Sequence, residues 1–125
     1  MIFRREIQII QAPVSLLAYI GDSVMSLYYK LEYIDLMRPS EIEKRVRKIV
    51  SRKGQADILD AVWSKLTEEE KSVVKRAMNS KSATRHGNDP LYRKSTGLEA
   101  LIGYLYLTGK DERLKEILNF SASID

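Results

Sequence analysis

The amino-acid sequence predicts an all-α fold: a single domain of about six or seven helices spanning residues 1–125. In several segments, apolar residues recur three and four positions apart, which is the period of an amphipathic helix. No segment shows the sustained alternation of a half-buried strand. A chain of 125 residues with 44% hydrophobic residues can form one domain with its own core.

The first half of the chain predicts three helices. Residues 13–31 form a long apolar-rich segment with a proline at its start, where a helix tolerates one. Residues 40–51 begin with Ser40 and carry Glu43 three positions later, the spacing of a capping box. Residues 55–66 repeat the helical apolar period.

The second half predicts three more helices around one long loop. Thr67 and Glu70 form another capping-box pair at the start of a helix. Residues 79–94 contain Gly, Asn, Asp and Pro among basic residues, so we expect a long loop of the kind that often carries function. Two further helices are expected over residues 96–107 and 112–120.

The composition restricts the chemistry that is available. The chain has no cysteine and one histidine, His86, to which we assign no role. Disulfides, thiolate zinc sites and histidine-rich metal sites are therefore excluded within one chain. Carboxylates, carbonyls and water remain as ligands, and they suit Mg²⁺, for which Mn²⁺ can substitute. The sequence shows no secretion signal and no run of about 18 apolar residues, so we expect a cytoplasmic protein.

Positive charge is concentrated in two blocks. The net charge is +4, but residues 38–53 hold seven basic and two acidic residues, and residues 71–94 hold seven and one. Such clustering is typical of proteins that bind a polyanion, and it favours nucleic acid. The alternative is that both blocks are ordinary solvated helix faces.

Two acidic residues stand in apolar helical segments. Asp22 follows Gly21 in the middle of the first predicted helix, and such local conflicts often mark functional sites. The alternative is an exposed Asp on an amphipathic helix. Glu99 enters the apolar segment after residue 95, where it could hold a metal or, paired with Thr96, cap the helix.

Residues 17–30 (LAYIGDSVMSLYYK) and 92–109 (YRKSTGLEALIGYLYLTG) resemble the two signature helices of the ribonuclease III catalytic domain. The resemblance is closest to Mini-ribonuclease III, the subfamily that consists of the catalytic domain alone. Ser15, Ala18 and Thr96 stand where larger members of the family carry acidic residues. Because that subfamily consists of the catalytic domain alone, we expect no separate double-stranded-RNA-binding domain.

The resemblance implies an activity and its residues. Asp22 and Glu99 match the family's catalytic metal ligands. The implied enzyme is a Mg²⁺-dependent endoribonuclease that hydrolyses double-stranded RNA to 5′-phosphate and 3′-hydroxyl ends. The implied substrate is a 23S ribosomal RNA precursor, and the implied assembly is a homodimer. Met25, Tyr28 and Tyr29 are candidates for the dimer interface, although ordinary core packing is an equal alternative.

Contacts with RNA are expected to go to phosphates and 2′-hydroxyls, because A-form RNA hides its base edges. The first candidates border the predicted loop: Arg76, Lys81, Arg85, Arg93 and Lys94. The second set lies in the earlier basic block: Lys44, Arg45, Arg47 and Lys48.

Two other classes of function remain open. One is a non-catalytic double-stranded-RNA-binding domain of the same fold that acts in ribosome assembly, which the missing acidic residues would favour. The other is a helical protein-interaction module, for which the basic blocks would be solvated surface.

Overall fold

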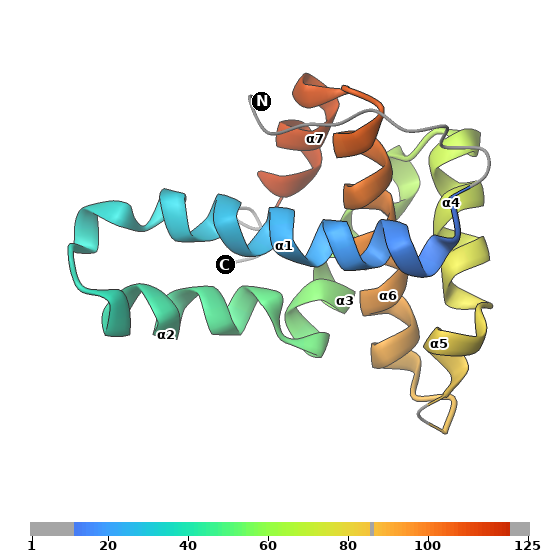
Figure 1. Ribbon diagram of the computed structural model, residues 1–125, viewed down its shortest axis with the longest axis horizontal. Coiled ribbons are helices and arrows are strands. Elements are labelled where there is room, and N and C mark those ends of the chain that lie inside the picture. The colour runs from blue at the N-terminus through green and yellow to red at the C-terminus, as the bar shows by residue number, and fades with distance from the viewer. Residues whose placement is uncertain (1–11, 86, 121–125) are drawn as a thin grey trace.

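The computed structural model describes residues 12–85 and 87–120, and within them it contains helices and no strand, which confirms the predicted all-α class (Figure 1). None of the described helices is long and apolar enough to cross a membrane. The elements, in chain order, are α1 (Val14–Glu32), η2 (Ile34–Leu36), α2 (Pro39–Val50), α3 (Arg52–Val62), η3 (Trp63–Lys65), α4 (Glu68–Met78), α5 (Lys81–Thr84), α6 (Pro90–Leu107) and α7 (Asp111–Leu118).

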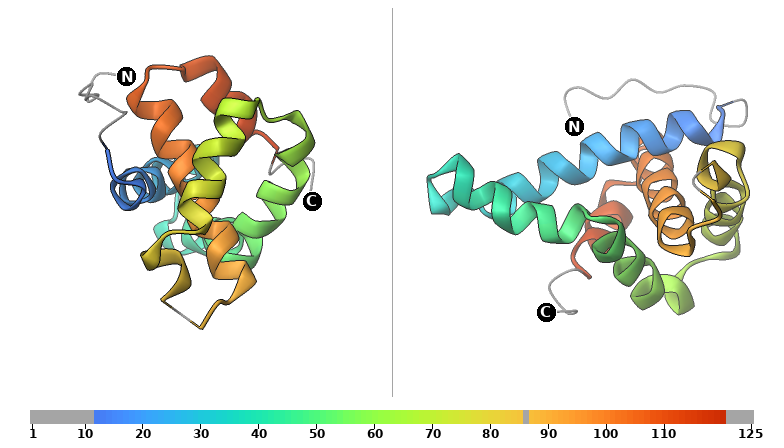
Figure 2. Two further views of the ribbon diagram at one scale, coloured as in Figure 1. Left: turned by 90° about the vertical axis from the view of Figure 1, so that its right-hand side faces the viewer. Right: turned by 90° about the horizontal axis from the view of Figure 1, so that it is seen from below.

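Helix α6 is the centre of the fold. It lies between α1 on one side and α3 and α4 on the other, as Figure 2 shows. Leu98, Leu101, Ile102 and Leu105 are completely buried. A helix that is apolar on nearly all sides must be surrounded by other elements to be stable in water. The sequence of α6 therefore requires this central position.

Helices α1 and α2 form an arm that extends from the body of the molecule (Figure 1). The chain reverses between them at Met37, which has the left-handed φ of 65°. Val46 of α2 is buried and Ile42, Ile49 and Val50 are half-buried against the core, whereas the basic residues of the helix are exposed. The arm therefore presents the first basic block as an exposed surface.

One predicted capping box is confirmed and one is wrong. The Thr67 hydroxyl accepts a hydrogen bond from Glu70 N at 3.1 Å, and Glu70 Oε1 accepts one from Thr67 N at 2.9 Å. Helix α2 instead begins at Pro39, with Arg38 as its N-cap and no side-chain cap. Proline at the first helical position is favourable because its missing N–H has no partner there in any helix.

The predicted loop over residues 79–94 is also wrong in most of its length. This range contains α5 and the first turn of α6. The connection between these two helices is therefore limited to residues 85–89, and His86 within it lies outside the described residues. The Asp89 side chain caps α6 by accepting a hydrogen bond from Leu91 N at 3.0 Å. Asp followed by Pro is a helix start as well as a turn signal, and here the helix forms.

Candidate metal centre and nucleic-acid interface

Helices α1 and α6 cross so closely that their backbones touch. A Cβ atom added to Gly21 would lie 1.7 Å from the carbonyl oxygen of Glu99, and one added to Gly103 would lie 1.9 Å from that of Leu17. Each helix therefore needs a glycine at this crossing. Glycine costs about 1 kcal/mol relative to alanine within a helix, and this contact explains its presence beside Asp22.

The crossing brings Asp22 and Glu99 together. Asp22 is exposed and Glu99 is half-buried, and the two carboxyl groups are hydrogen-bonded to each other. Burial raises the pKa of Glu99 to about 8, and the hydrogen bond and negative charge of Asp22 act in the same direction. A hydrogen bond from the Gln55 side chain opposes this rise in the pKa of Glu99. Strongly perturbed carboxyl groups of this kind are typical of functional sites.

The positions of Glu99 and Asp22 in the fold decide between the metal-ligand role and the structural alternatives. Glu99 does not cap a helix, because α6 begins at Pro90 and Thr96 lies inside it. The Thr96 hydroxyl donates to the carbonyl of Tyr92 at 3.0 Å. Asp22 is exposed, which agrees with the alternative of an exposed Asp on an amphipathic helix. It is nevertheless paired with a second carboxyl group, that of Glu99.

The Asp22–Glu99 pair fits a divalent cation held by few protein ligands. The described part of the chain contains no group of three or more His, Cys, Asp or Glu side chains that could hold a metal ion. Two adjacent carboxylates repel each other when both are ionised, and a bound cation removes that repulsion. Mg²⁺ often retains several water ligands and binds protein through one or two carboxylates together with a phosphate.

The first group of candidate RNA contacts divides into two kinds. Arg76, Lys81 and Arg85 are exposed. Arg93 and Lys94 instead make contacts within the fold. Arg93 Nε donates to the carbonyl of Met78 at 2.9 Å, which caps the end of α4. Its Nη2 donates to Asn79, and Lys94 binds Asp60 on α3 at 2.9 Å.

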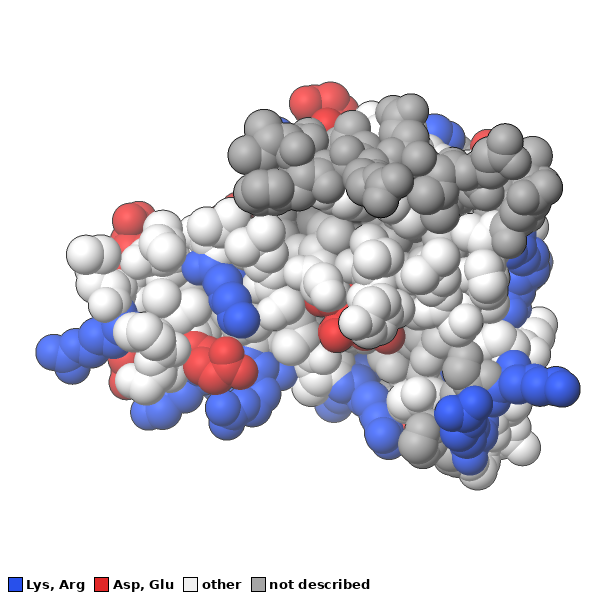
Figure 3. All heavy atoms as spheres, viewed as in Figure 1, with Lys and Arg blue, Asp and Glu red and all other residues white. Residues whose placement is uncertain are grey.

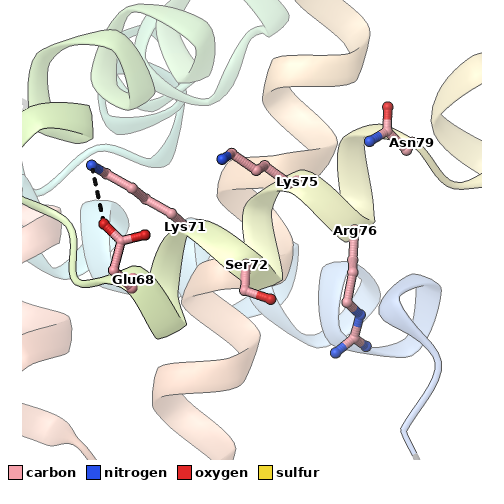
Figure 4. Close-up of a pocket in the computed structure, with 6 residues that line it drawn as sticks. All are labelled: Glu68, Lys71, Ser72, Lys75, Arg76 and Asn79. Carbon is pink, nitrogen blue, oxygen red and sulfur yellow. Dashed lines mark ion pairs between the residues drawn. The ribbon is translucent and has the colours of Figure 1, made fainter.

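A shallow basic pocket on α4 extends the surface around Arg76 (Figure 4). Its volume is about 550 Å³. Lys71 and Lys75 point to one side of α4 and Arg76 to the other. Lys71 and Lys75 were not among the predicted residues, although their spacing of four places both on one helix face. The lining residues are Glu68, Lys71, Ser72, Lys75, Arg76 and Asn79.

The second group of candidates lies on the exposed face of α2. Lys44 and Arg47 form long ion pairs with glutamates of the same helix, at 3.6 and 4.0 Å. Arg45 lies over the ring of Tyr33. Exposed pairs of this kind contribute little to stability, so these side chains can move to contact a ligand.

In Figure 3, acidic atoms lie below α1 near its crossing with α6, and Lys and Arg side chains lie to both sides of them.

Two of the three predicted interface residues on α1 require a correction. Met25 is completely buried and Tyr29 is 2% exposed, with its hydroxyl donating to the carbonyl of Leu118 at 2.8 Å. Both residues therefore belong to the core, which was the alternative. The exposed apolar surface of α1 lies on another face, where Leu27 and Leu31 line a groove of about 530 Å³ between α1, α6 and α7.

Comparison with known proteins identifies the family of this chain. The sequence model of the ribonuclease III domain family matches residues 15–110 of this chain, and this range includes both Asp22 and Glu99. The chain belongs to the ribonuclease III family. This match confirms the family that was predicted from the two signature helices. It also confirms the predicted enzyme class, an endoribonuclease.

Relatives of similar length support the assignment. The chain is 42% identical to Mini-ribonuclease 3 of Brevibacillus brevis over 86% of this chain and 84% of that protein. It is 41% identical to Mini-ribonuclease 3 of Thermoanaerobacter sp., over 86% and 79% of the two chains. A crystal structure of a protein from Fusobacterium nucleatum matches with a TM-score of 0.80 and 32% identity, over 90% of this chain and 93% of that one.

Gln55 is another residue that the sequence analysis did not assign to the site. It lies on α3, is 2% exposed and is hydrogen-bonded to Glu99. Its position in the apolar stripe with Ile58, Leu59 and Val62 is the signal that could have identified it. A polar side chain on a buried face requires a partner, and only the folded chain shows that this partner is Glu99.

Proposed function

We propose that Asp22 and Glu99 hold a Mg²⁺ ion, with which this ribonuclease III-family enzyme hydrolyses double-stranded RNA to 5′-phosphate and 3′-hydroxyl ends. One observation carries the proposal. The contact between the backbones of α1 and α6 at Gly21 joins two carboxyl groups at an accessible place in a ribonuclease III domain.

The side chains have distinct roles in this mechanism. Asp22 would offer the cation an exposed carboxylate, and Glu99 would offer one whose pKa is raised by burial, so that its proton would have to leave before it could bind the cation. When bound, Mg²⁺ acidifies a water molecule and neutralises charge on the phosphate. With only two protein carboxylates, water and the RNA phosphate would supply the remaining ligands. Mn²⁺, which prefers the same oxygen ligands, substitutes for Mg²⁺.

The basic surfaces on α2 and α4 supply the affinity for RNA. Lys44, Lys48 and Arg76 represent exposed positions on these two helices. They contact phosphates and recognise the shape of an A-form duplex, with little reading of its bases. Arg93 and Lys94 contribute chiefly by fixing α6 against α4 and α3.

The functional unit is a homodimer, with one centre for each strand. Leu27 and Leu31, which are 49% and 56% exposed, belong to an apolar groove that a second copy of the chain covers by two-fold symmetry. Large exposed apolar patches are uncommon on monomeric proteins. The resemblance to Mini-ribonuclease III supports a 23S ribosomal RNA precursor as the substrate and the cytoplasm as the location.

The test is cleavage of a labelled RNA duplex by the wild type, Asp22→Asn and Glu99→Gln. Glu112→Gln is the matched control, because Glu112 is an exposed carboxylate of α7. We expect the wild type and the control to cut in Mg²⁺ or Mn²⁺ and not in chelator. Each site variant should bind the duplex but cut at least about 100-fold more slowly.

Two results would contradict the mechanism. If Asp22→Asn and Glu99→Gln both cut at the wild-type rate, the metal is held elsewhere. If the wild type binds the duplex without cutting it in either metal, the domain is a non-catalytic binder of double-stranded RNA.

A further inference from the structure

We propose that a hollow beside Trp63 binds an unpaired nucleotide of single-stranded RNA. The base stacks on the indole ring, and the phosphate pairs with Lys75. The inference goes beyond the proposed cleavage of duplexes and does not depend on the Asp22–Glu99 site.

The Trp63 hollow lies where α3, η3, α4 and α6 meet. Its volume is about 330 Å³, at the lower end of the range for pockets that hold small molecules. Leu59 is buried, and Trp63 and Met78 are half-buried, so the hollow has an apolar floor and a charged rim. The lining residues are Leu59, Asp60, Trp63, Lys75, Met78 and Lys94.

The Trp63 hollow is separate from the carboxylate pair. Helix α6 lies between α1, which carries Asp22, and the helices α3 and α4, which line the hollow. Lys94 and Glu99 are five residues apart on α6, so they point about 140° apart around the helix axis. An RNA strand in the hollow therefore leaves the metal site free.

Two ammonium groups lie over the ring of Trp63. Lys71 Nζ is 5.5 Å and Lys75 Nζ is 5.9 Å from the ring centroid, and both side chains leave the same side of α4 (Figure 4). The ring therefore has a face that the core does not cover. A base stacked on an aromatic ring is bound more strongly than an exposed ammonium group, so a base can displace the lysines from this face.

Lys75 is the cation best placed to bind the phosphate of that nucleotide. Lys94 donates to Asp60 at 2.9 Å, and Lys71 forms a long ion pair with Glu68 at 3.9 Å. Lys75 is exposed, and within the described part of the chain no carboxylate forms an ion pair with it. Its charge is therefore available to a phosphate.

The aromatic ring favours a single strand over a duplex. In a duplex, neighbouring base pairs cover both faces of each base, whereas an unpaired base can stack on an aromatic side chain. A positively charged surface with an accessible aromatic ring is typical of proteins that bind single strands. RNA, rather than DNA, follows from the ribonuclease III family of the chain.

The experiment measures tryptophan fluorescence of the complete protein in chelator, where no RNA is cut. Trp63 is the only tryptophan of the chain, so the signal reports on this hollow alone. The ligands are a short oligouridylate, a blunt RNA duplex of the same length, and UMP. We expect the oligouridylate to quench the fluorescence, and the duplex and UMP to leave it nearly unchanged at the same nucleotide concentration.

Variants test the two contacts by the anisotropy of a labelled oligouridylate. Lys75→Ala removes the phosphate contact. Lys65→Ala is its matched control, because Lys65 is an exposed lysine two residues from Trp63 whose ammonium lies over Phe120 at 4.6 Å. Trp63→Leu removes the ring, and Trp63→Phe keeps an aromatic face. Thermal unfolding of each variant is recorded in parallel.

We expect Lys75→Ala to lower the salt slope of binding by about 0.7, the value for one phosphate contact of a single strand. Trp63→Leu should bind at least about 5-fold more weakly, and Trp63→Phe should restore most of the affinity. Lys65→Ala should behave as the wild type. Equal quenching by duplex and oligouridylate, or an equal loss of slope in the two lysine variants, would overturn the inference. UMP that binds as tightly as the oligouridylate would overturn it as well, because the hollow would then hold a free nucleotide.

Cleavage of the blunt duplex in Mg²⁺ separates this inference from the proposed function. If the wild type cuts the duplex while the oligouridylate leaves the fluorescence unchanged, the nuclease stands and the site at Trp63 is rejected. If the oligouridylate quenches the fluorescence but no duplex is cut, the site at Trp63 stands and the proposed function is rejected.

Discussion

The Cα of Gly21 lies against the carbonyl group of Glu99, and there is no room between them for a side chain: a Cβ at Gly21 would be 1.7 Å from that oxygen. The contact sets the separation of α1 and α6. It also sets the distance between Asp22, the next residue of α1, and the Glu99 side chain.

Gly21→Ala should therefore disturb both the fold and the site. The obstructing atoms are backbone atoms, so the helices must move apart, which we expect to cost about 3 kcal/mol or more in the free energy of unfolding. Urea unfolding and cleavage of a duplex measure the two effects. The control is Ser23→Ala, at an exposed position of α1. Equal stability of the two variants would show that the crossing tolerates a methyl group.

The raised pKa of Glu99 predicts how stability depends on pH without metal. The folded protein holds the Glu99 proton up to a pKa of about 8, against 4.5 for an ordinary glutamate. The contribution of protonated Glu99 to the free energy of unfolding is therefore complete below pH 4.5 and is lost as the pH rises through 8. Glu99→Gln should thus be more stable than the wild type at pH 9, by about 1–3 kcal/mol.

Urea unfolding in chelator from pH 5 to 9 tests this prediction. The stability difference between Glu99→Gln and the wild type should grow with pH, and added Mg²⁺ should reduce it by stabilising the wild type. A difference that is constant across the range would show that the pKa of Glu99 is not raised.

The Glu70–Arg113 pair predicts an opposite dependence at acid pH. Arg113 donates to both carboxylate oxygens of Glu70, at 2.9 and 2.8 Å, and holds the pKa of Glu70 below its usual range. The contribution of the pair to the free energy of unfolding is therefore present above the pKa that Glu70 has in the unfolded chain. It is lost as the pH falls through the lower pKa that Glu70 has in the folded protein. Arg113→Met should cost about 2–4 kcal/mol at pH 7, because Glu70 stays buried without its partner.

Glu116→Gln is the control for Arg113→Met. It removes only the ion pair between Arg113 and Glu116, whose side chain is 60% exposed. Such pairs contribute at most about 1 kcal/mol. Thermal unfolding at pH 7 compares the two variants, and a similar loss in both would assign the effect to surface charge.

The two kinds of basic residue near α6 should respond differently to substitution. Arg85→Ala should weaken duplex binding and lower the salt slope by about 0.9 if one phosphate contact is lost. Arg93→Ala should chiefly destabilise the fold, by about 1–2 kcal/mol, because the last carbonyl of α4 loses its donor. Salt titrations of binding and thermal unfolding separate the effects. An unchanged slope for Arg85→Ala would remove this residue from the interface.

Leu31→Glu should convert the proposed dimer to monomers. Leu31 is 56% exposed, so the substitution leaves the core intact but places a charge in the apolar groove. Light scattering gives the mass in solution. Leu91→Glu, at a 41% exposed position near the start of α6, is the control. If both variants have the mass of the wild-type dimer, the dimer interface lies on another surface than this groove.

Much of the local structure was predicted from the sequence, because local structure depends on neighbouring residues. The helical period of apolar residues predicted the all-α class, and the Thr67–Glu70 spacing predicted a cap that the structure contains. The signature helices predicted the family. The same local signals failed at residues 79–94, where Asp89 and Pro90 begin a helix that the pattern assigned to a loop.

The tertiary structure decided which side chains meet, because contacts between α1, α3 and α6 depend on how the helices pack. From the sequence, Asp22 was an anomaly and Gln55 was one residue of an apolar stripe. Packing on Gly21 places Asp22 beside Glu99, and packing of α3 on α6 adds Gln55. Packing also placed Met25 and Tyr29 in the core rather than at an interface. Helix period fixes a side chain's direction around its own axis, but only the crossing of helices determines what it touches.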